Sequence, residues 1–236
     1  MNNEQPDTTA RKSLDFQTLL LKSVMPSINP GSLYLISAQP GAGKSSFALR
    51  LVRDLVIREE PKRILYLSLD LDRWSIVQKL VIAVTSQPFE DFEDNQEALG
   101  HINDLLELLP LNIRHVPDAT VPKLGKIVLD TKDIDLVIID DLDHIDGAIG
   151  DDRNPPTAQI KQIAKQLHVP IICMASQKER SVIGVDAAFR LELAGDQSGG
   201  DEVAVRFDSR KNGTELVFYK EKMEFGFSAS ALRTCN

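Results

Sequence analysis

Eight residues near the start of the chain have the types and spacing of a phosphate-binding loop. They occupy positions 38–45 and read Ala-Gln-Pro-Gly-Ala-Gly-Lys-Ser. The two glycines let backbone N–H groups turn toward an anion, and a helix expected to begin near Lys44 points its positive end the same way. We expect the Lys44 ammonium to contact the β- and γ-phosphates of a nucleotide and the Ser45 hydroxyl to ligate Mg²⁺. The first position, usually Gly, is Ala38, which fits if its φ is negative.

The loop is expected between an apolar strand and an amphipathic helix, which is the context that this motif requires. The run Leu33–Ser37 before it is short, apolar and typical of a strand. After it, apolar residues repeat at helical spacing from Phe47 to Val56. The sequence therefore predicts a nucleotide site formed by the loop and the residue that follows it. The residues assigned to this site are Gln39, Pro40, Gly41, Ala42, Gly43, Lys44, Ser45 and Ser46.

An acidic residue later in the chain fits the same chemistry. The run Leu136–Ile139 is the least polar of the predicted strands, and Asp140 follows it directly. In a parallel sheet this carboxylate would lie at the edge where the phosphate-binding loop also emerges. It can hold a water bound to Mg²⁺ while Ser45 and phosphate oxygens supply other ligands. This is a Walker B pattern, and Ser45 and Asp140 are the predicted metal residues.

Hydrolysis of a nucleoside triphosphate also needs a carboxylate that orients and deprotonates the attacking water, and two residues are candidates. Asp70 follows the predicted strand Ile64–Leu69, and Asp141 follows Asp140. The order of the strands in the sheet decides between them, and we favour Asp70. Gln177, at the end of a later apolar strand, would place an amide near the γ-phosphate.

Composition limits the class of protein. The chain has 236 residues, of which 42% are hydrophobic and 26% charged, and this suits one soluble globular domain. The aromatic share of 6% argues against a surface that stacks bases, and the net charge of −8 means that nucleic-acid contact needs a local basic patch. Only two cysteines, no signal peptide and no apolar run of membrane-spanning length indicate a cytoplasmic protein with reduced thiols.

Strand and helix patterns alternate along most of the chain, and the strands are apolar enough to be covered on both faces. We therefore predict an α/β fold with a mostly parallel central sheet and helices on both of its faces. Near the end, Val203–Phe207 and Leu216–Tyr219 flank Asn212-Gly213, the strongest short signal for a β-hairpin. The sheet is therefore expected to close with a C-terminal antiparallel β-hairpin.

Both ends of the chain are expected to lie outside the core domain. A flexible tail with a linker-like helix, the α/β domain and a C-terminal tail are assigned to residues 1–28, 29–228 and 229–236. The helix is predicted over Leu14–Leu21, and it could lie on its own domain or on a neighbouring subunit. Within the domain, the acidic stretch Pro88–Asn95 is expected to be a loop.

In their order along the chain, these motifs resemble the RecA-like ATPase domain of DnaB-type replicative helicases, from about Pro30 to Phe225. Residues 30–33, Pro-Gly-Ser-Leu, are similar to the family's Pro-Gly-Asp/Glu-Leu, and residues 68–71, Ser-Leu-Asp-Leu, to its Ser-Leu-Glu-Met. Four later motifs of the family, Val-Pro-Val, Ser-Gln-x-x-Arg, Asp-Ala-Asp and Arg-Asn-Gly, resemble residues 169–171, 176–180, 186–188 and 211–213. The helicases' N-terminal helical domain has no counterpart in this sequence.

The resemblance implies a RecA-like P-loop fold that binds and hydrolyses ATP with Mg²⁺. It also implies a homo-oligomeric, hexamer-like ring that acts on single-stranded DNA with replication proteins. Asp70 takes the place of the family's catalytic Glu, whereas many other P-loop ATPases use the residue after the Walker B aspartate, here Asp141. The arginine finger, which reaches the neighbouring subunit's site, falls on Lys211, with Arg210 beside it. The residues assigned to catalysis are Lys44, Asp70, Asp140, Asp141, Gln177 and Lys211.

Three departures from the family pattern leave two functions open. Asp70 is one methylene shorter than Glu, Lys211 lacks the planar fork of Arg, and the segment between Arg180 and Asp186 is shorter than the one that holds the helicases' DNA-binding loop. The first hypothesis is a ring-forming helicase or DNA-remodelling motor in DNA replication. The alternative is a nucleotide-dependent switch or accessory ATPase that regulates a protein partner without translocating on DNA.

Overall fold

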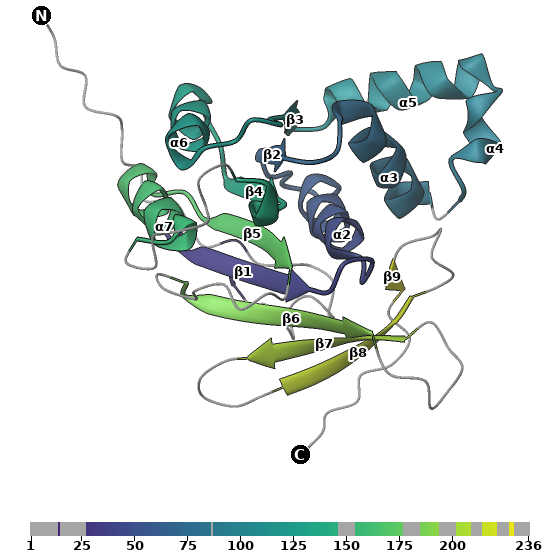
Figure 1. Ribbon diagram of the computed structural model, residues 1–236. Helices are drawn as coiled ribbons and strands as arrows, with labels where there is room; N and C mark the ends of the chain where they lie inside the picture. The colour runs from purple at the N-terminus through teal and green to yellow at the C-terminus, as the bar shows by residue number, and fades with distance from the viewer. Residues whose placement is uncertain are drawn as a thin grey trace, which may run out of the picture.

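One β-sheet with helices on both faces contains the described strands (Figure 1). The computed structural model describes residue 14 and residues 27–85, 87–145, 154–176, 185–193, 202–208, 214–220 and 227–228. The strands are β1 Leu33–Ala38, β2 Ile64–Ser68, β3 Leu111–His115, β4 Leu136–Asp140, β5 Ile171–Ser176, β6 Ala187–Leu193, β7 Glu202–Asp208, β8 Thr214–Lys220 and β9 Phe227–Ser228. The helices are α2 Lys44–Val56, α3 Arg73–Thr85, α4 Glu90–Glu93, α5 Gln96–Leu108, α6 Val121–Asp130, the 3₁₀ turn η1 Leu142–His144 and α7 Pro156–Leu167.

The strands follow the order β3-β2-β4-β5-β1-β6-β7-β8-β9 across the sheet. From β3 to β6 they run parallel, and β7, β8 and β9 add antiparallel pairings at one edge. In Figure 1 this antiparallel edge lies at the bottom, while α6, β3 and α5 lie at the top. The predicted α/β fold, with a mostly parallel sheet and a C-terminal antiparallel hairpin, is confirmed.

Alternation along the buried strands divides the core between the two faces of the sheet. Tyr66 and Ile138 pack with the apolar residues of α2 and α3. Their neighbours Leu67 and Ile139 pack on the opposite side, with α6 and α7. Successive side chains of a strand point to opposite faces, so each strand contributes to both cores. Burial on both faces explains why these strands read as continuous apolar runs in the sequence.

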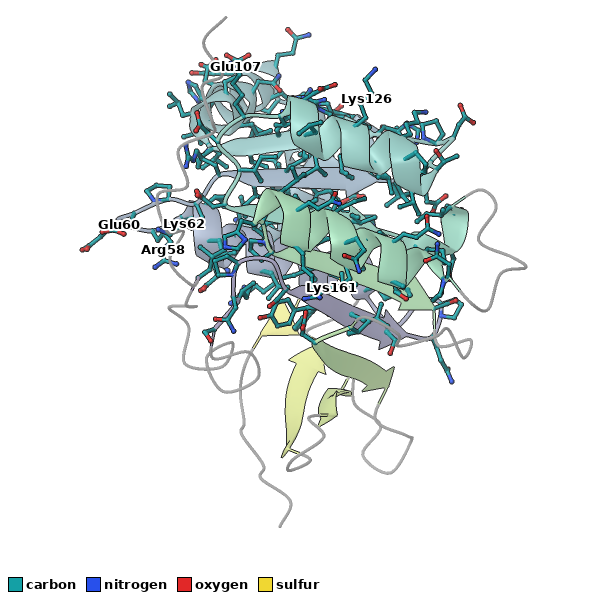
Figure 2. The ribbon with its side chains drawn as sticks, turned by 90° about the vertical axis from the view of Figure 1, so that its left-hand side faces the viewer. Arg58, Glu60, Lys62, Glu107, Lys126 and Lys161 are labelled. Atoms are coloured by element: carbon teal, nitrogen blue, oxygen red, sulfur yellow. The ribbon has the colours of Figure 1, made fainter. Side chains whose placement is uncertain are left out.

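Near the first residues of β1 and β6, a buried lysine joins three segments of the chain. Lys161 of α7 donates to the Gly31 carbonyl oxygen at 2.8 Å and to the Asp186 carboxylate. The same carboxylate accepts from the Leu33 N–H at 2.7 Å, where β1 begins. Figure 2 shows Lys161 on α7, the helix that lies over β1. This network fixes α7 to the beginnings of β1 and β6.

A second charge pair lies where β2 and β4 begin. The Arg63 guanidinium donates to both carboxylate oxygens of Asp135 at 3.2 Å, and the Arg63 N–H donates to Oδ2 at 2.9 Å. Burial works against ionisation of Asp135, but the hydrogen bonds from Arg63 outweigh it and lower the pKa of this carboxyl. The pair therefore stabilises the register in which Ile64 lies beside Leu136.

Two elements differ from the sequence prediction. The stretch Pro88–Asn95, expected to be a loop, contains the single helical turn α4. Strand β6 was not predicted because Arg190 and Glu192 interrupt its apolar residues, and pairing with β1 on one side and β7 on the other defines it instead. The extra parallel strand connects the nucleotide side of the sheet to the predicted hairpin.

Leu14 and Ile28, which the sequence analysis assigned to the N-terminal tail and helix, lie in the core. They exchange backbone hydrogen bonds of 2.9 and 2.8 Å, and both side chains are buried on the α2 side of the sheet. Leu14 therefore belongs to a β-bridge rather than to a helix. Residues 15–26 and the predicted C-terminal tail, 229–236, lie outside the described residues. Among the described helices, none is long and apolar enough to cross a bilayer.

Candidate active site

The phosphate-binding loop joins β1 to α2 at the edge of the sheet where the parallel strands end. Gly41 and Gly43 have φ angles of 79° and 89°, in the left-handed region that glycine adopts without strain. Ala38, which replaces the usual Gly, is the buried last residue of β1 and does not need a positive φ. No described side chain caps α2, and its first turn holds no acidic residue. The N–H groups at the start of α2 are thus left open to an anion.

Asp140 ends β4 beside this loop and is almost completely buried, with 4% of its surface exposed. Its Oδ2 accepts a hydrogen bond of 2.7 Å from the Tyr66 hydroxyl, and its Oδ1 has no hydrogen-bond partner among the described residues. Burial raises the pKa of Asp140, and the Tyr66 and Ser45 hydroxyls and the Lys44 ammonium offset only part of this effect. A buried carboxylate oxygen without a partner is costly unless a cation or its water occupies the space beside it.

The side-chain oxygens of Ser45 and Asp140 at this edge suit a hydrated Mg²⁺. The Ser45 hydroxyl is close enough to Asp140 to lower the pKa of that carboxyl. Within the described part of the chain, no group of three or more His, Cys, Asp or Glu side chains could enclose a metal by itself. Mg²⁺ commonly keeps several waters and takes one or two protein ligands together with substrate phosphates, so Ser45 and Asp140 suffice for this mode of binding.

The lysine of the loop meets the residue after the Walker B aspartate. Lys44 Nζ lies 3.2 Å from Asp141 Oδ2, and their side chains are only 11% and 16% exposed. The other oxygen of Asp141 accepts from the Asp143 N–H at 3.2 Å, which caps the turn η1. Burial raises the pKa of Asp141, and the Asp143 N–H and Lys44 offset part of the rise. Three of the predicted residues, Lys44, Asp140 and Asp141, are therefore brought together.

Asp70 lies at the same edge of the sheet but in a different environment. It follows β2, which pairs with β4, and the Leu69 N–H donates to the Asp140 carbonyl oxygen at 2.6 Å. The Asp70 side chain is 60% exposed, and its Oδ1 lies 3.8 Å from His144 Nε2. Its negative charge contributes to the raised pKa of Asp140. Asp70 is therefore open to solvent near the buried carboxylate, whereas Asp141 is shielded and paired.

Gln177 and Lys211, together with Arg210, fall outside the described part of the chain, so their positions stay predictions. The strand before Gln177 does reach the site, because the Ser176 N–H donates to Asp143 Oδ2 at 2.7 Å. This contact joins the end of β5 to the turn that follows Asp140.

Sequence reasoning missed the roles of Tyr66 and Asp143. Tyr66 is completely buried, and this burial, followed by the negative charge of Asp140 and the hydrogen bond to it, raises the pKa of the phenol well above its usual value. A tyrosine inside an otherwise apolar strand is the signal that points to it. The sequence does not identify the partner of this tyrosine, because the contact with Asp140 depends on the pairing and register of β2 and β4.

Residues 15–185, more than half of the chain, match the DnaB-like helicase C terminal domain family. The chain belongs to this family. Its relatives include a "Probable plasmid replicative DNA helicase" of Chlamydia trachomatis, 26% identical over an alignment 165 residues long that covers 64% of this chain and 36% of that protein. The chain thus spans about a third of the length of the curated relatives that it matches.

Solved structures share the fold of this DnaB-like domain. A structure of a DnaB-like replicative helicase and its interactions with primase has a TM-score of 0.70 and 16% identity, over 85% of this chain and 57% of that one. The ATPase domain of G40P has the same TM-score and identity, over 86% of each chain. The RecA-like architecture predicted from the ordered motifs is confirmed, and residues Lys44, Asp140 and Asp141 lie where its parallel strands end.

Proposed function

We propose that the chain is the ATPase unit of a ring-forming, DnaB-like helicase or DNA-remodelling motor that acts in DNA replication. The observation that carries this proposal is the convergence of Lys44, buried Asp140 and Asp141 beside an open helix N-terminus. One cationic donor, one carboxylate oxygen without a described partner and a glycine-lined anion site are the parts that a nucleoside triphosphate with Mg²⁺ requires.

The residues have distinct tasks in this proposal. The loop N–H groups and Lys44 would bind the phosphates of ATP, and Ser45 and Asp140 would hold Mg²⁺. When bound, Mg²⁺ neutralises phosphate charge that builds up in the transition state. Asp70 accepts a proton from the attacking water, because its exposed carboxylate acts on the neighbouring Asp140 without being tied to Lys44.

The ring and its partners are inferred from membership of the family. In a ring, Lys211 or Arg210 of one subunit would act on the γ-phosphate held by the next subunit, and Gln177 would report whether that phosphate is present. Single-stranded DNA is the proposed track of the motor. One of the similar solved structures concerns interactions with primase, so a primase is the first replication protein to test as a partner.

Steady-state hydrolysis of Mg²⁺-ATP with and without single-stranded DNA tests the proposal. For a motor we expect stimulation of roughly tenfold, because productive binding to the track assembles the catalytic geometry. Mass photometry in the same buffers should show subunits joining into a ring when ATP and Mg²⁺ are present. A protein that stays monomeric, with a rate indifferent to DNA, would refute the motor.

One feature favours the alternative, a nucleotide-dependent switch that binds a protein partner. Residues 90–108, which form α4 and α5, hold seven acidic residues and no Lys or Arg. Leu105 and Leu108 of α5 are 62% and 80% exposed. Such a surface repels a phosphate backbone but suits a protein. Slow hydrolysis that ignores DNA, together with ATP-dependent binding of a replication protein, is the result that this alternative predicts.

A further inference from the structure

The ammonium that should bind phosphate already has an anionic partner within the chain. Lys44 Nζ lies 3.2 Å from Asp141 Oδ2, and both side chains are more than four-fifths shielded from solvent. Solvent and salt screen shielded charges less than exposed ones. The pair is therefore a stronger interaction than an ordinary surface ion pair, and it lies at the position that the nucleotide phosphates must approach.

Asp141 is held in this position by its own turn. Its Oδ1 accepts from the Asp143 N–H at 3.2 Å, which leaves Oδ2 directed to Lys44. Asp143 is fixed in turn, because its Oδ2 accepts from the Ser176 N–H at the end of β5. The carboxylate is thus built into the loop after β4, and it cannot move away from the lysine at no cost when an anion arrives.

The charges at this edge do not balance once phosphate is added. Among the described residues, Lys44 is the cation that acts on both buried carboxylates, Asp140 and Asp141. A nucleoside triphosphate brings several further negative charges to the same lysine. Like charges placed together at a poorly solvated site repel one another strongly, so phosphate binding without another cation is opposed.

We propose that Asp141 competes with nucleotide phosphate for Lys44 and thereby makes tight ATP binding dependent on Mg²⁺. In the empty site Asp141 holds the ammonium. When Mg²⁺-ATP binds, Lys44 turns to the phosphates, and the divalent charge compensates the two carboxylates that the lysine leaves. The inference rests on the proposed nucleotide site, and it gives Asp141 a positioning role instead of the role of the base.

The test measures ATP binding by isothermal titration calorimetry, once in EDTA and once with excess Mg²⁺. For Asp141→Asn we expect ATP affinity in EDTA to rise roughly tenfold, with a smaller gain in Mg²⁺. The ratio of the two affinities, which measures dependence on Mg²⁺, should therefore fall. Asn and Ser both cap turns, so Asp141→Ser should fold and show the same change, whereas Asp141→Glu should keep the wild-type ratio.

Asp143→Asn is the matched control. It removes the same charge two residues away, its amide oxygen can still accept from the Ser176 N–H, and the ion pair between Lys44 and Asp141 stays in place. Its affinity in EDTA should change less than about threefold. An equal gain in Asp143→Asn, or no gain in Asp141→Asn and Asp141→Ser, overturns the inference while leaving the nucleotide site intact. A wild-type protein that binds no ATP in either buffer overturns the proposed function as well.

Discussion

Two charge pairs join the beginnings of the parallel strands. The edge where the same strands end holds, beside the ion pair of Lys44 and Asp141, a buried carboxylate with one oxygen that has no described partner. At the first edge Arg63 binds both oxygens of Asp135, and Lys161 binds the Asp186 carboxylate. At the second edge Asp140 is buried with one oxygen lacking a described partner. The pKa of Asp135 is lowered by its partner, whereas burial raises the pKa of Asp140.

The contrast distinguishes paired charges, which stabilise the fold, from the buried Asp140 carboxylate, which can bind a ligand. A hydrogen-bonded and paired carboxylate favours the folded state at neutral pH. A buried carboxylate with a raised pKa disfavours it, and the energy is recovered only when a cation binds. The two edges of one sheet should therefore respond in opposite ways to loss of a charge.

The largest effect is expected at the edge where the parallel strands end. Asp140→Asn removes the metal-binding carboxylate, so Mg²⁺-ATP turnover should fall by roughly a hundredfold or more. The free energy of unfolding in urea should stay equal to that of the wild type or rise, because a buried charge has been removed. Loss of both turnover and stability would contradict the contrast.

The next effect concerns the base. Asp70→Asn should lower turnover roughly a hundredfold, the usual contribution of a general base, with ATP affinity changed by less than about threefold. Asp70→Glu restores the length found in related helicases, so we expect turnover roughly threefold above the wild type. If Asp70→Asn hydrolyses ATP at the normal rate while Asp141→Asn does not, Asp141 is the base.

At the edge where the parallel strands begin, loss of a charge should affect stability alone. Lys161→Met leaves Asp186 and the Gly31 carbonyl without their donor, and we expect a loss of about 1–2 kcal/mol in the free energy of unfolding, reduced because Asp186 is partly exposed. Exposed Lys126 on α6 is the control, since Figure 2 shows it directed away from the sheet. Lys126→Met should stay within about 0.5 kcal/mol of the wild type. Turnover per folded molecule should be normal in both variants.

The smallest effect follows from the lowered pKa of Asp135. A carboxyl whose folded-state pKa lies below its unfolded value stabilises the protein at neutral pH, and this contribution is lost as pH falls through the folded-state value. Because Arg63 is half-exposed, the contribution is at most about 1 kcal/mol. Urea midpoints measured from pH 7 to pH 3 should fall less steeply for Asp135→Asn than for the wild type. If the urea midpoints of the two proteins fall equally with pH, the ion pair of Arg63 and Asp135 contributes nothing to stability.

The loop of residues 38–45 and Asp140 could be located from the sequence because each depends on local spacing. A glycine-rich loop before a helical pattern, and an aspartate after a wholly apolar strand, are both contained in a few neighbouring residues. The fold class followed for the same reason, since apolar runs alternate with helical periodicity. The hairpin was found through Asn212-Gly213, which has its own strong turn preference.

The contacts that give the site its electrostatics could not be predicted in this way. The bonds from Tyr66 to Asp140 and from Lys44 to Asp141 join residues far apart in the chain, and both depend on strand order and register. Strand β5 lies between β4 and β1, so the two acidic residues reach the loop across an intervening strand. The sequence also offered no sign that Leu14 pairs with Ile28, because a single β-bridge has no periodicity.

The most direct measurement compares steady-state Mg²⁺-ATP hydrolysis by the wild type and by Lys44→Ala, with equal folding checked by circular dichroism. Lys44 belongs to the phosphate-binding loop, and its ammonium contacts Asp141, the residue that follows β4. We predict measurable wild-type turnover and a rate at least roughly a hundredfold lower in the variant. Equal rates in the two proteins would contradict the assignment of this edge of the sheet as the active site.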